Sequence, residues 1–377
     1  MTAEISNEKL VVRALFISKL EKERGGNFTV KKYSLWKKIV LGISAASLVG
    51  GGILTSCSSQ GKPTTTATSI EVQKTENNND NKSKGDSKVY MTKAINPSGL
   101  QKVYEALGRK ATGKVAVKIS TGEPGGNYYL SPDLIKGLVQ SVNGTIVECN
   151  TAYGGGRTST EMHKQVAKDH GFAAIANVDI MDEDDSLSIP VKDGKRLKED
   201  LVGSHLANYD FVMVLSHFKG HMMGGFGGAI KNISIGIGSQ KGKNLIHTGG
   251  NTTEPWMPMM NTLNQDNFLE AMAEAGKAVS DYEGNGSKML YISVMNNLSI
   301  DCDCASNPAK PEIADIGILA STDPVALDQA CVDLASKAPG SQSLVNRIND
   351  RHGVHTLEHA EEIGLGSRKY QLESIDG

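Results

Sequence analysis

The chain has 377 residues, of which 39% are hydrophobic and 22% are charged, a balance typical of a globular protein with one large domain or two. The formal net charge is -2 and only 5% of the residues are aromatic, so the composition shows no bias toward nucleic acid and we expect no nucleic-acid partner. The 41 glycines indicate tight turns and places where a ligand can approach the backbone.

The segment that precedes the predicted fold has the features of an export signal. A lysine pair is followed by an uncharged, mostly apolar run of 16 residues, Ile39 to Leu54, which is short for a membrane span. The run ends in Leu-Thr-Ser-Cys, which resembles a lipobox, with Cys57 as the residue that receives the lipid. We therefore predict a signal peptide over residues 1–57 and lipidation of Cys57. The alternative is an uncleaved N-terminal anchor helix.

Lipidation would place the protein at the cell membrane. Two acyl chains on Cys57 are enough for stable anchoring, so we expect a lipid-anchored protein on the extracytoplasmic face. Residues 58–88 are rich in Ser, Thr, Asn and Lys and nearly free of large apolar side chains, which predicts a flexible linker. Residues 89–377 then form the folded domain, either as one body or as two subdomains.

Within the folded part, apolar runs of strand length alternate with helical patterns. We predict strands at residues 114–119, 144–149, 210–216, 288–295 and 315–321, and helices at 132–142, 159–171, 267–282 and from Pro324 onward. Asp323 before Pro324 is a typical N-cap before a first-turn proline. The alternation predicts an α/β fold: a mainly parallel β-sheet flanked by helices.

Polar loops follow all five predicted strands, and three of these loops are rich in glycine. They are STGEPGGNYY, NTAYGGGRTST, HFKGHMMGGFGGAIKN, NNLSIDCDCASNP and STDP. Because ligands bind at the carboxyl ends of the strands in sheets of this kind, we expect the five loops to converge on one pocket.

The third of these loops combines ligand-type side chains with bare backbone. His217, Lys219, His221 and Lys231 supply imidazole and amine groups between glycines. The three-residue gap between the histidines would suit a metal site on a helix, but the glycines argue against a regular helix. Backbone N–H groups at glycines can hold an anion, with charge from Lys219, Lys231, Lys241 or Lys243. Tight turns with solvated lysines are the alternative.

The cysteines offer a second kind of chemistry. With Cys57 assigned to lipid, four remain: Cys149, Cys302, Cys304 and Cys331. In the DCDC motif, Cys302 and Cys304 lie on the same side of an extended chain, so they would either pair with each other or bind one soft metal ion as thiolates. The helix that contains Cys331 makes it a small buried apolar residue. No C-x2-C spacing occurs, so the chain has no ferredoxin-type iron–sulfur motif.

These motifs together resemble one family, the domain-of-unknown-function family 362. The matching segments are TGEPGGNYYLSPDLI, NTAYGGGRTST, HFKGHMMGGFGGAIKNISIGIGSQKGK, DCDC, PEIADIGILASTDPVALDQACVDL and HAEEIGLGSRKYQLESI. The resemblance covers the chain from about Met91 to its end. Many members are described as iron–sulfur-centre proteins because a ferredoxin-like insertion commonly follows the K-G-K…H segment. In this chain that place, GKNLIHTGGNTTEPWMPMMN, contains no cysteine.

The resemblance implies a shared core of His217, Lys219, His221, Lys231, Asn232, His247, Cys302, Cys304 and Asp323. We assign candidate catalytic roles to His217, Lys219, His221 and Lys231, cofactor binding to Gly224, Gly225, Gly227, Gly228, Asn232, His247 and Arg157, and metal ligation to Cys302 and Cys304. Two hypotheses follow. One is a metal- or cofactor-dependent surface enzyme, for which redox chemistry is one option, and the other is a lipoprotein that holds a small anionic ligand on its glycine-rich loops.

Overall fold

The computed structural model describes residues 86–377, which belong to one compact unit. The predicted signal peptide, Cys57 and most of the predicted linker lie outside the described residues. Strand β1 (Ser87–Thr92) begins two residues before the predicted start of the folded domain at Val89. Among the described residues, no helix combines the length and the apolar character needed to cross a membrane.

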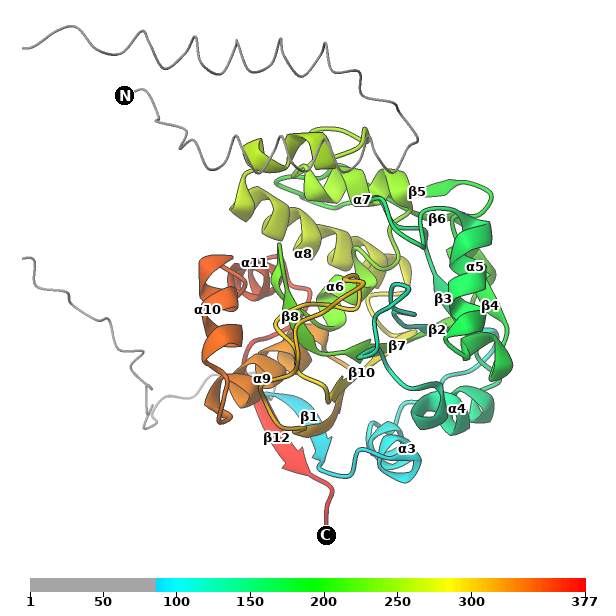
Figure 1. Cartoon of the computed structure of the whole chain (residues 1–377), viewed down its shortest axis with the longest axis vertical. Helices are drawn as coiled ribbons and strands as arrows, with labels where there is room; N and C mark the ends of the chain where they lie inside the picture. Colours follow the sequence, from blue (N-terminus) through cyan, green and yellow to red (C-terminus); the bar gives the residue numbers. More distant parts are fainter. Residues whose placement is uncertain (1–85) are drawn as a thin grey trace, which may run out of the picture. The chain divides into compact units, whose positions relative to one another are not determined.

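A central eight-stranded sheet organises this part of the chain (Figure 1). The strand order is β12 (Tyr370–Ser374), β1, β11 (Gly317–Ser321), β10 (Met289–Met295), β7 (Phe211–His217), β2 (Val115–Lys118), β3 (Thr145–Glu148) and β4 (Val178–Ile180). The neighbours from β10 to β4 are parallel, as are β12 and β1, whereas β11 is antiparallel to both β1 and β10. The predicted α/β fold with a mainly parallel sheet is confirmed.

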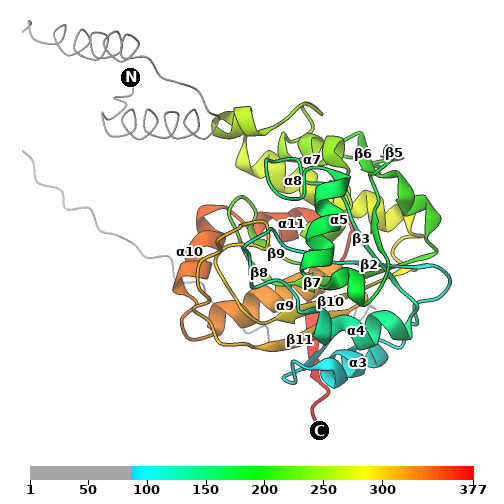
Figure 2. The same ribbon diagram turned by 45° about the vertical axis from the view of Figure 1, so that its right-hand side comes forward.

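Helices cover both faces of the sheet (Figures 1 and 2). On one face lie α3 (Pro97–Ala106), α4 (Pro132–Ser141) and α5 (Thr160–Asp169); on the other lie α6 (Ala229–Ile233), α8 (Gln265–Tyr282), α9 (Pro324–Lys337) and α11 (His355–Glu362). Along β7, Met213 and Leu215 face the first group, and Val212 and Val214 face the second. Burial on both faces explains why this strand has a nearly continuous apolar sequence.

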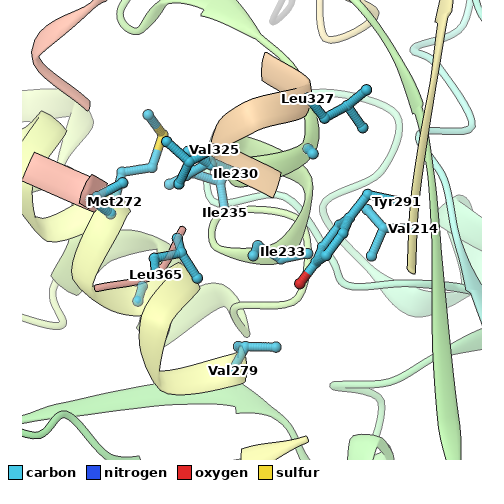
Figure 3. Close-up of a cluster of buried hydrophobic side chains, with 14 of the residues drawn as sticks. Val214, Ile230, Ile233, Ile235, Met272, Val279, Tyr291, Val325, Leu327 and Leu365 are labelled. Atoms are coloured by element: carbon cyan, nitrogen blue, oxygen red, sulfur yellow. The ribbon is translucent and has the colours of Figure 1, made fainter. Parts of the chain in front are cut away.

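The short helix α6 is fixed by its apolar side. Figure 3 shows Ile230 and Ile233 of α6 in a cluster with Met272 and Val279 of α8 and Tyr291 of β10. These side chains are buried, and their apolar surface stabilises the position of the helix. The two residues between the isoleucines, Lys231 and Asn232, are thereby held in place beside the carboxyl ends of the strands.

The glycine-rich segment forms a hairpin before it enters α6. Strand β8 (Lys219–His221) pairs with β9 (Gly225–Gly227), and Gly225 has a φ of 78°, a left-handed conformation that favours glycine. The expectation that this segment is not a regular helix is confirmed. A second hairpin joins β5 (Ser186–Pro190) to β6 (Glu199–Gly203).

The remaining elements are short or peripheral. Helix α7 (Gln240–His247) packs against β6 and α8, and α10 (Gln342–Asp350) packs against the β8–β9 hairpin. The 3-10 helices are η1 (Phe172–Ala174), η2 (Ser204–Asn208) and η3 (Met257–Thr262). Cys331, in α9, is fully buried, as its helical position predicts.

Strand β11 runs antiparallel to β10. The prediction that the loop after this strand joins the others at the carboxyl edge of the sheet is therefore wrong. In β11, Ser321 pairs with Tyr291 at the start of β10, so the loop after β11 lies at the amino edge of the neighbouring parallel strands. There Asp323 caps α9, because its side chain accepts hydrogen bonds from the N–H groups of Val325 and Ala326. β10 and β11 are joined without a crossover helix, which is why the chain returns antiparallel. Asp323 is therefore a structural residue.

Candidate functional site

A cavity of about 260 Å³ lies at the carboxyl edge of β2, β3, β7 and β10. Four of the five predicted loops contribute to it. Of the predicted site residues, it is lined by Arg157, His217, Lys219, His221, Gly227, Gly228, Lys231, Asn232, His247, Cys302 and Cys304. The convergence expected from the strand-end loops is thus observed for these residues, with the loop after β11 as the exception.

Two predicted ligand-binding glycines do not line this cavity. Gly225 packs against Gly353 and Ile348, where a side chain would collide with backbone atoms. Gly224 uses its N–H to donate a hydrogen bond of 2.8 Å to Nδ1 of His221. Gly224 and Gly225 therefore shape the β8–β9 turn and orient a side chain of the cavity, and the prediction that they contact a ligand is not supported.

The floor of the cavity is a buried network of paired charges. Lys118 donates to Glu148 at 3.1 Å and to the side-chain oxygen of Asn232 at 3.0 Å. Arg157 donates to Glu148 at 3.2 Å and to Glu123 at 3.0 Å. Burial by itself would raise the pKa of Glu148, but Lys118, His163 and Arg157 outweigh it and hold that pKa well below its usual value. The network fixes α6 to the sheet through Asn232.

Asp303, between the two cysteines, anchors the wall formed by β7 and β8. Its carboxylate accepts from Lys219 Nζ at 2.6 Å and from His217 Nδ1 at 2.9 Å. Burial opposes this charge, but Lys219 and His217 outweigh it and keep the pKa of Asp303 well below its usual range. Nε2 of His217 lies 2.7 Å from the carbonyl oxygen of Asn296. Because both ring nitrogens face acceptors of the protein, His217 is held within this wall and positions Asp303.

One ring nitrogen of His221 is also occupied by a hydrogen bond within the protein. Its Nδ1 accepts from the N–H of Gly224, so the proton of the neutral ring is on Nε2. Burial lowers the pKa of His221 well below its usual value, and the nearby charge of Lys231 lowers it further, so the ring is neutral. In this orientation His221 offers the cavity a donor instead of a metal-binding lone pair.

His247 differs from the other two histidines because its Nε2 is available. Nδ1 donates to the carbonyl oxygen of Lys243 at 2.6 Å, which leaves the lone pair on Nε2. Burial is the main reason why the pKa of His247 falls to about 4, so the ring stays neutral at physiological pH. Stacking on Trp256, with ring centroids 4.6 Å apart, and on Phe268 at 5.1 Å fixes its plane.

Two lysines of the cavity have no carboxylate partner among residues 86–377. No acceptor in this part of the chain lies within hydrogen-bonding distance of Lys231 Nζ, and Lys243 Nζ donates only to the carbonyl oxygens of Gly238 and Cys149. Burial, aided by Lys219, lowers the pKa of Lys231 to about 7. Since Lys118, Arg157 and Lys219 already engage Glu148, Glu123 and Asp303, the cavity has surplus positive charge.

Cys302 and Cys304 line the same cavity from a tight turn in the loop that follows β10. The structure pairs them as a disulfide, with Cα atoms 5.2 Å apart, which is the first of the two alternatives open from the sequence. Their sulfur atoms and a ring nitrogen of His221 lie within 4.8 Å of one another. The mouth of the same cavity is lined by exposed methionines: Met222, Met257 and Met260.

The sequence interpretation missed Lys118 as part of the site. Its strand, β2, is buried on both faces, and a lysine in such a strand requires a polar partner. That signal was present in the motif KVAVKI, where the last lysine interrupts the apolar face that meets α6. Trp256, Met257 and Met260 were missed as well, because they lie in a segment with no periodic pattern. Met222 was missed although it lies in the third loop, since a methionine there carries no signal of its own.

The fold and the cavity define this part of the chain as an α/β protein with a charged pocket at the carboxyl edge of a mainly parallel sheet. The family profile described as "Domain of unknown function (DUF362)" matches residues 115–333, more than half of the chain. The chain belongs to this family.

Comparison with solved structures finds two distant similarities among its matches. The lactate racemase apoprotein from Thermoanaerobacterium thermosaccharolyticum is 11% identical, with a TM-score of 0.40 over 67% of this chain and 57% of that one. A protein from Thermotoga maritima is 12% identical, with a TM-score of 0.32 over 71% of this chain and 58% of that one. The chain thus spans less than two thirds of either protein. No curated protein matches it.

Proposed function

We propose that this protein is a lipid-anchored extracytoplasmic protein whose cavity binds a small anionic ligand. The observation that carries the proposal is Lys231, an amine on the cavity wall with no acceptor among the described residues. Lys231 is half-buried, and an ammonium group that loses part of its hydration is costly unless a counter-charge compensates it. A ligand that brings a negative charge to Lys231 supplies what the protein itself lacks at this position.

The surroundings of Lys231 favour a carboxylate or phosphate. Lys243 adds a second cation without a carboxylate partner. Lys118 and Arg157 do not add to this surplus, because both are paired with the carboxylate of Glu148 on the floor of the cavity. His221 adds a neutral N–H donor, and His247 adds a neutral acceptor for a hydroxyl or a protonated group. A cavity of about 260 Å³ suits a compact solute. This combination supports the second of the two hypotheses drawn from the sequence.

We expect small anions to raise the melting temperature of the detergent-solubilised, full-length protein in a saturable way. Acetate, succinate, phosphate and pyrophosphate are the probes, each as the sodium salt at constant ionic strength. At a concentration one hundred times the Kd, a ligand adds about 2.7 kcal/mol to the free energy of unfolding. Lys231→Met should abolish the response, and Lys241→Met, at a position whose side chain is 65% exposed, should retain it. The proposal fails if none of the anions gives a saturable shift, or if both variants respond alike.

The anchoring part of the proposal rests on the sequence before the described residues. The apolar run and Leu-Thr-Ser-Cys at residues 54–57 support lipidation of Cys57. Cells grown with labelled palmitate should incorporate the label into the protein, and Cys57→Ser should remove the label and leave a full-length precursor. Wild-type protein without label that keeps the mass of the precursor would contradict the proposal and favour the uncleaved anchor helix.

A further inference from the structure

We infer that Cys302 and Cys304, when reduced, bind one Cu(I) ion, and that exposed methionines at the cavity mouth guide the ion to them. The inference goes beyond anion binding, since it concerns the sulfur wall of the cavity and a cation. It rests on the number of ligands that the cavity can offer, on its charge, and on the kind of side chain at its entrance.

The number of ligands favours a metal that accepts low coordination. Three groups, His221, Cys302 and Cys304, have ligand atoms within 4.8 Å of one another. Nδ1 of His221 already accepts from Gly224, and both ring nitrogens of His217 face acceptors of the protein, so neither ring is free to coordinate a metal in this arrangement. Two sulfurs remain. Zinc sites use three or four protein ligands, whereas Cu(I) is selected by soft sulfur ligands and is stable with few of them.

The charge of the cavity also favours a monovalent ion. Two thiolates carry two negative charges, and the cavity supplies Lys231 and Lys243 without carboxylate partners among the described residues. Cu(I) bound by two thiolates keeps one net negative charge, which these lysines attract. A divalent ion would cancel the thiolate charge and leave both ammonium groups without compensation. The lysines that favour an anionic ligand thus also favour Cu(I) over Zn(II) at the sulfurs of the same cavity.

The entrance to the cavity is lined by thioethers. Met222 is 55% exposed, Met257 is 44% exposed and Met260 is 38% exposed, although large apolar side chains among residues 86–377 are mostly buried. All three line the same cavity as the cysteines. A thioether is a soft, uncharged ligand that holds Cu(I) weakly, so it is suited to transfer the ion and poorly suited to retain Zn(II).

The binding step is a ligand exchange without electron transfer. Each thiol loses its proton to solvent, two Cu–S bonds form, and the copper stays in the +1 state. Only the dithiol can hold the ion firmly, because the two thiolates that bind it do not exist when the sulfurs are bonded to each other. The pairing seen in the structure is therefore the form that does not bind copper.

The test uses full-length protein in detergent, reduced with dithiothreitol and then freed of reductant under anaerobic conditions. The probe is Cu(I) held by the coloured chelator bicinchoninate. We expect the reduced protein to withdraw one equivalent of Cu(I), seen as a loss of chelator colour, and to withdraw no Zn(II) from a zinc indicator. Protein that has not been reduced should withdraw no copper, which provides a control without any mutation.

Two sets of variants test the cysteine ligands and the methionines of the cavity entrance separately. Cys302→Ser and Cys304→Ser should each lose Cu(I) withdrawal, and Cys331→Ala, which removes a cysteine buried in α9, should retain it. The triple variant Met222→Leu, Met257→Leu, Met260→Leu should bind the same amount of Cu(I) more slowly. Cu(I) withdrawal that persists in both cysteine variants would overturn the site, as would Zn(II) binding as tight as Cu(I) binding. An unchanged loading rate in the triple variant would overturn the role of the methionines. None of these outcomes depends on whether small anions bind.

Discussion

Replacement of Asp303 by alanine should lower the free energy of unfolding by about 3–5 kcal/mol, because it removes one partner of a buried ion pair and leaves the other charge uncompensated. Asp303 accepts from both Lys219 and His217, and all three side chains are buried. Urea unfolding of the full-length protein at pH 7, followed by circular dichroism, measures the change. The same substitution should reduce anion binding, because the β7–β8 wall loses its anchor.

The neighbouring aspartate of the same motif is the matched control. Asp301 has a side chain that is 29% exposed, and it lies 3.6 Å from Arg347 and accepts a hydrogen bond from the N–H of Ala309. Asp301→Ala should cost about 1 kcal/mol, as expected for a partly exposed pair and one hydrogen bond. Equal losses for the two variants would show that Asp303 does not act as an anchor.

The pH dependence of the Asp303→Ala effect follows from the depressed pKa of Asp303. Between the folded pKa and the ordinary value of 3.8, the unfolded chain binds more protons at this group than the folded protein does. The stability that Asp303 contributes is therefore fully present above pH 3.8 and decreases as the pH falls toward the folded pKa. The difference between the protein and Asp303→Ala should be constant from pH 5 to pH 7 and become smaller in more acidic solution.

The elements that the sequence predicted well are those whose pattern is local. Strands β2, β3, β7 and β10 have apolar runs and helices after or between them, so both their positions and their parallel direction could be inferred. The direction of β11 could not, because an apolar strand has the same pattern in either direction. Its orientation depends on the long connection from β10, which contains no helix in the described structure. The expectation that the loop after β11 joins the pocket was wrong for this reason, whereas the predicted capping role of Asp323 is confirmed.

The composition of the site was predictable, but the roles within it were not. Polar loops after parallel strands were enough to bring Arg157, Lys231 and Cys302 to one cavity. The chemistry of each histidine depends on what its second ring nitrogen contacts, and those contacts are made by distant residues. His217 faces Asp303 across 86 positions of sequence, while His247 faces a carbonyl group four residues away. The sequence identifies the histidines, but only the folded structure determines which ring nitrogen of each histidine keeps a free lone pair.

Replacement of Lys231 by methionine should raise the stability of the ligand-free protein and at the same time abolish anion binding. The pKa of Lys231 is lowered to about 7, mainly by burial, so the folded protein opposes the charge on this amine. Methionine has a similar length and no charge to desolvate. We expect a gain of roughly 1–3 kcal/mol in the free energy of unfolding at pH 6, the size of a typical single-residue effect. A functional cation that costs stability is expected where a ligand supplies the missing counter-charge.

The same variant should show a distinctive dependence on pH. Below about pH 7 the amine is protonated in both states, so its desolvation cost is fully present; above its ordinary pKa of 10.5 it is neutral in both, and the cost is absent. The advantage of Lys231→Met should therefore be largest at pH 6 and decline steadily between pH 7 and pH 10. Lys241→Met, at an exposed position, should change stability by less than about 0.5 kcal/mol throughout. If Lys231→Met were less stable than the unmutated protein at pH 6, Lys231 would have a partner within the protein, and the argument for an anionic ligand would lose its basis.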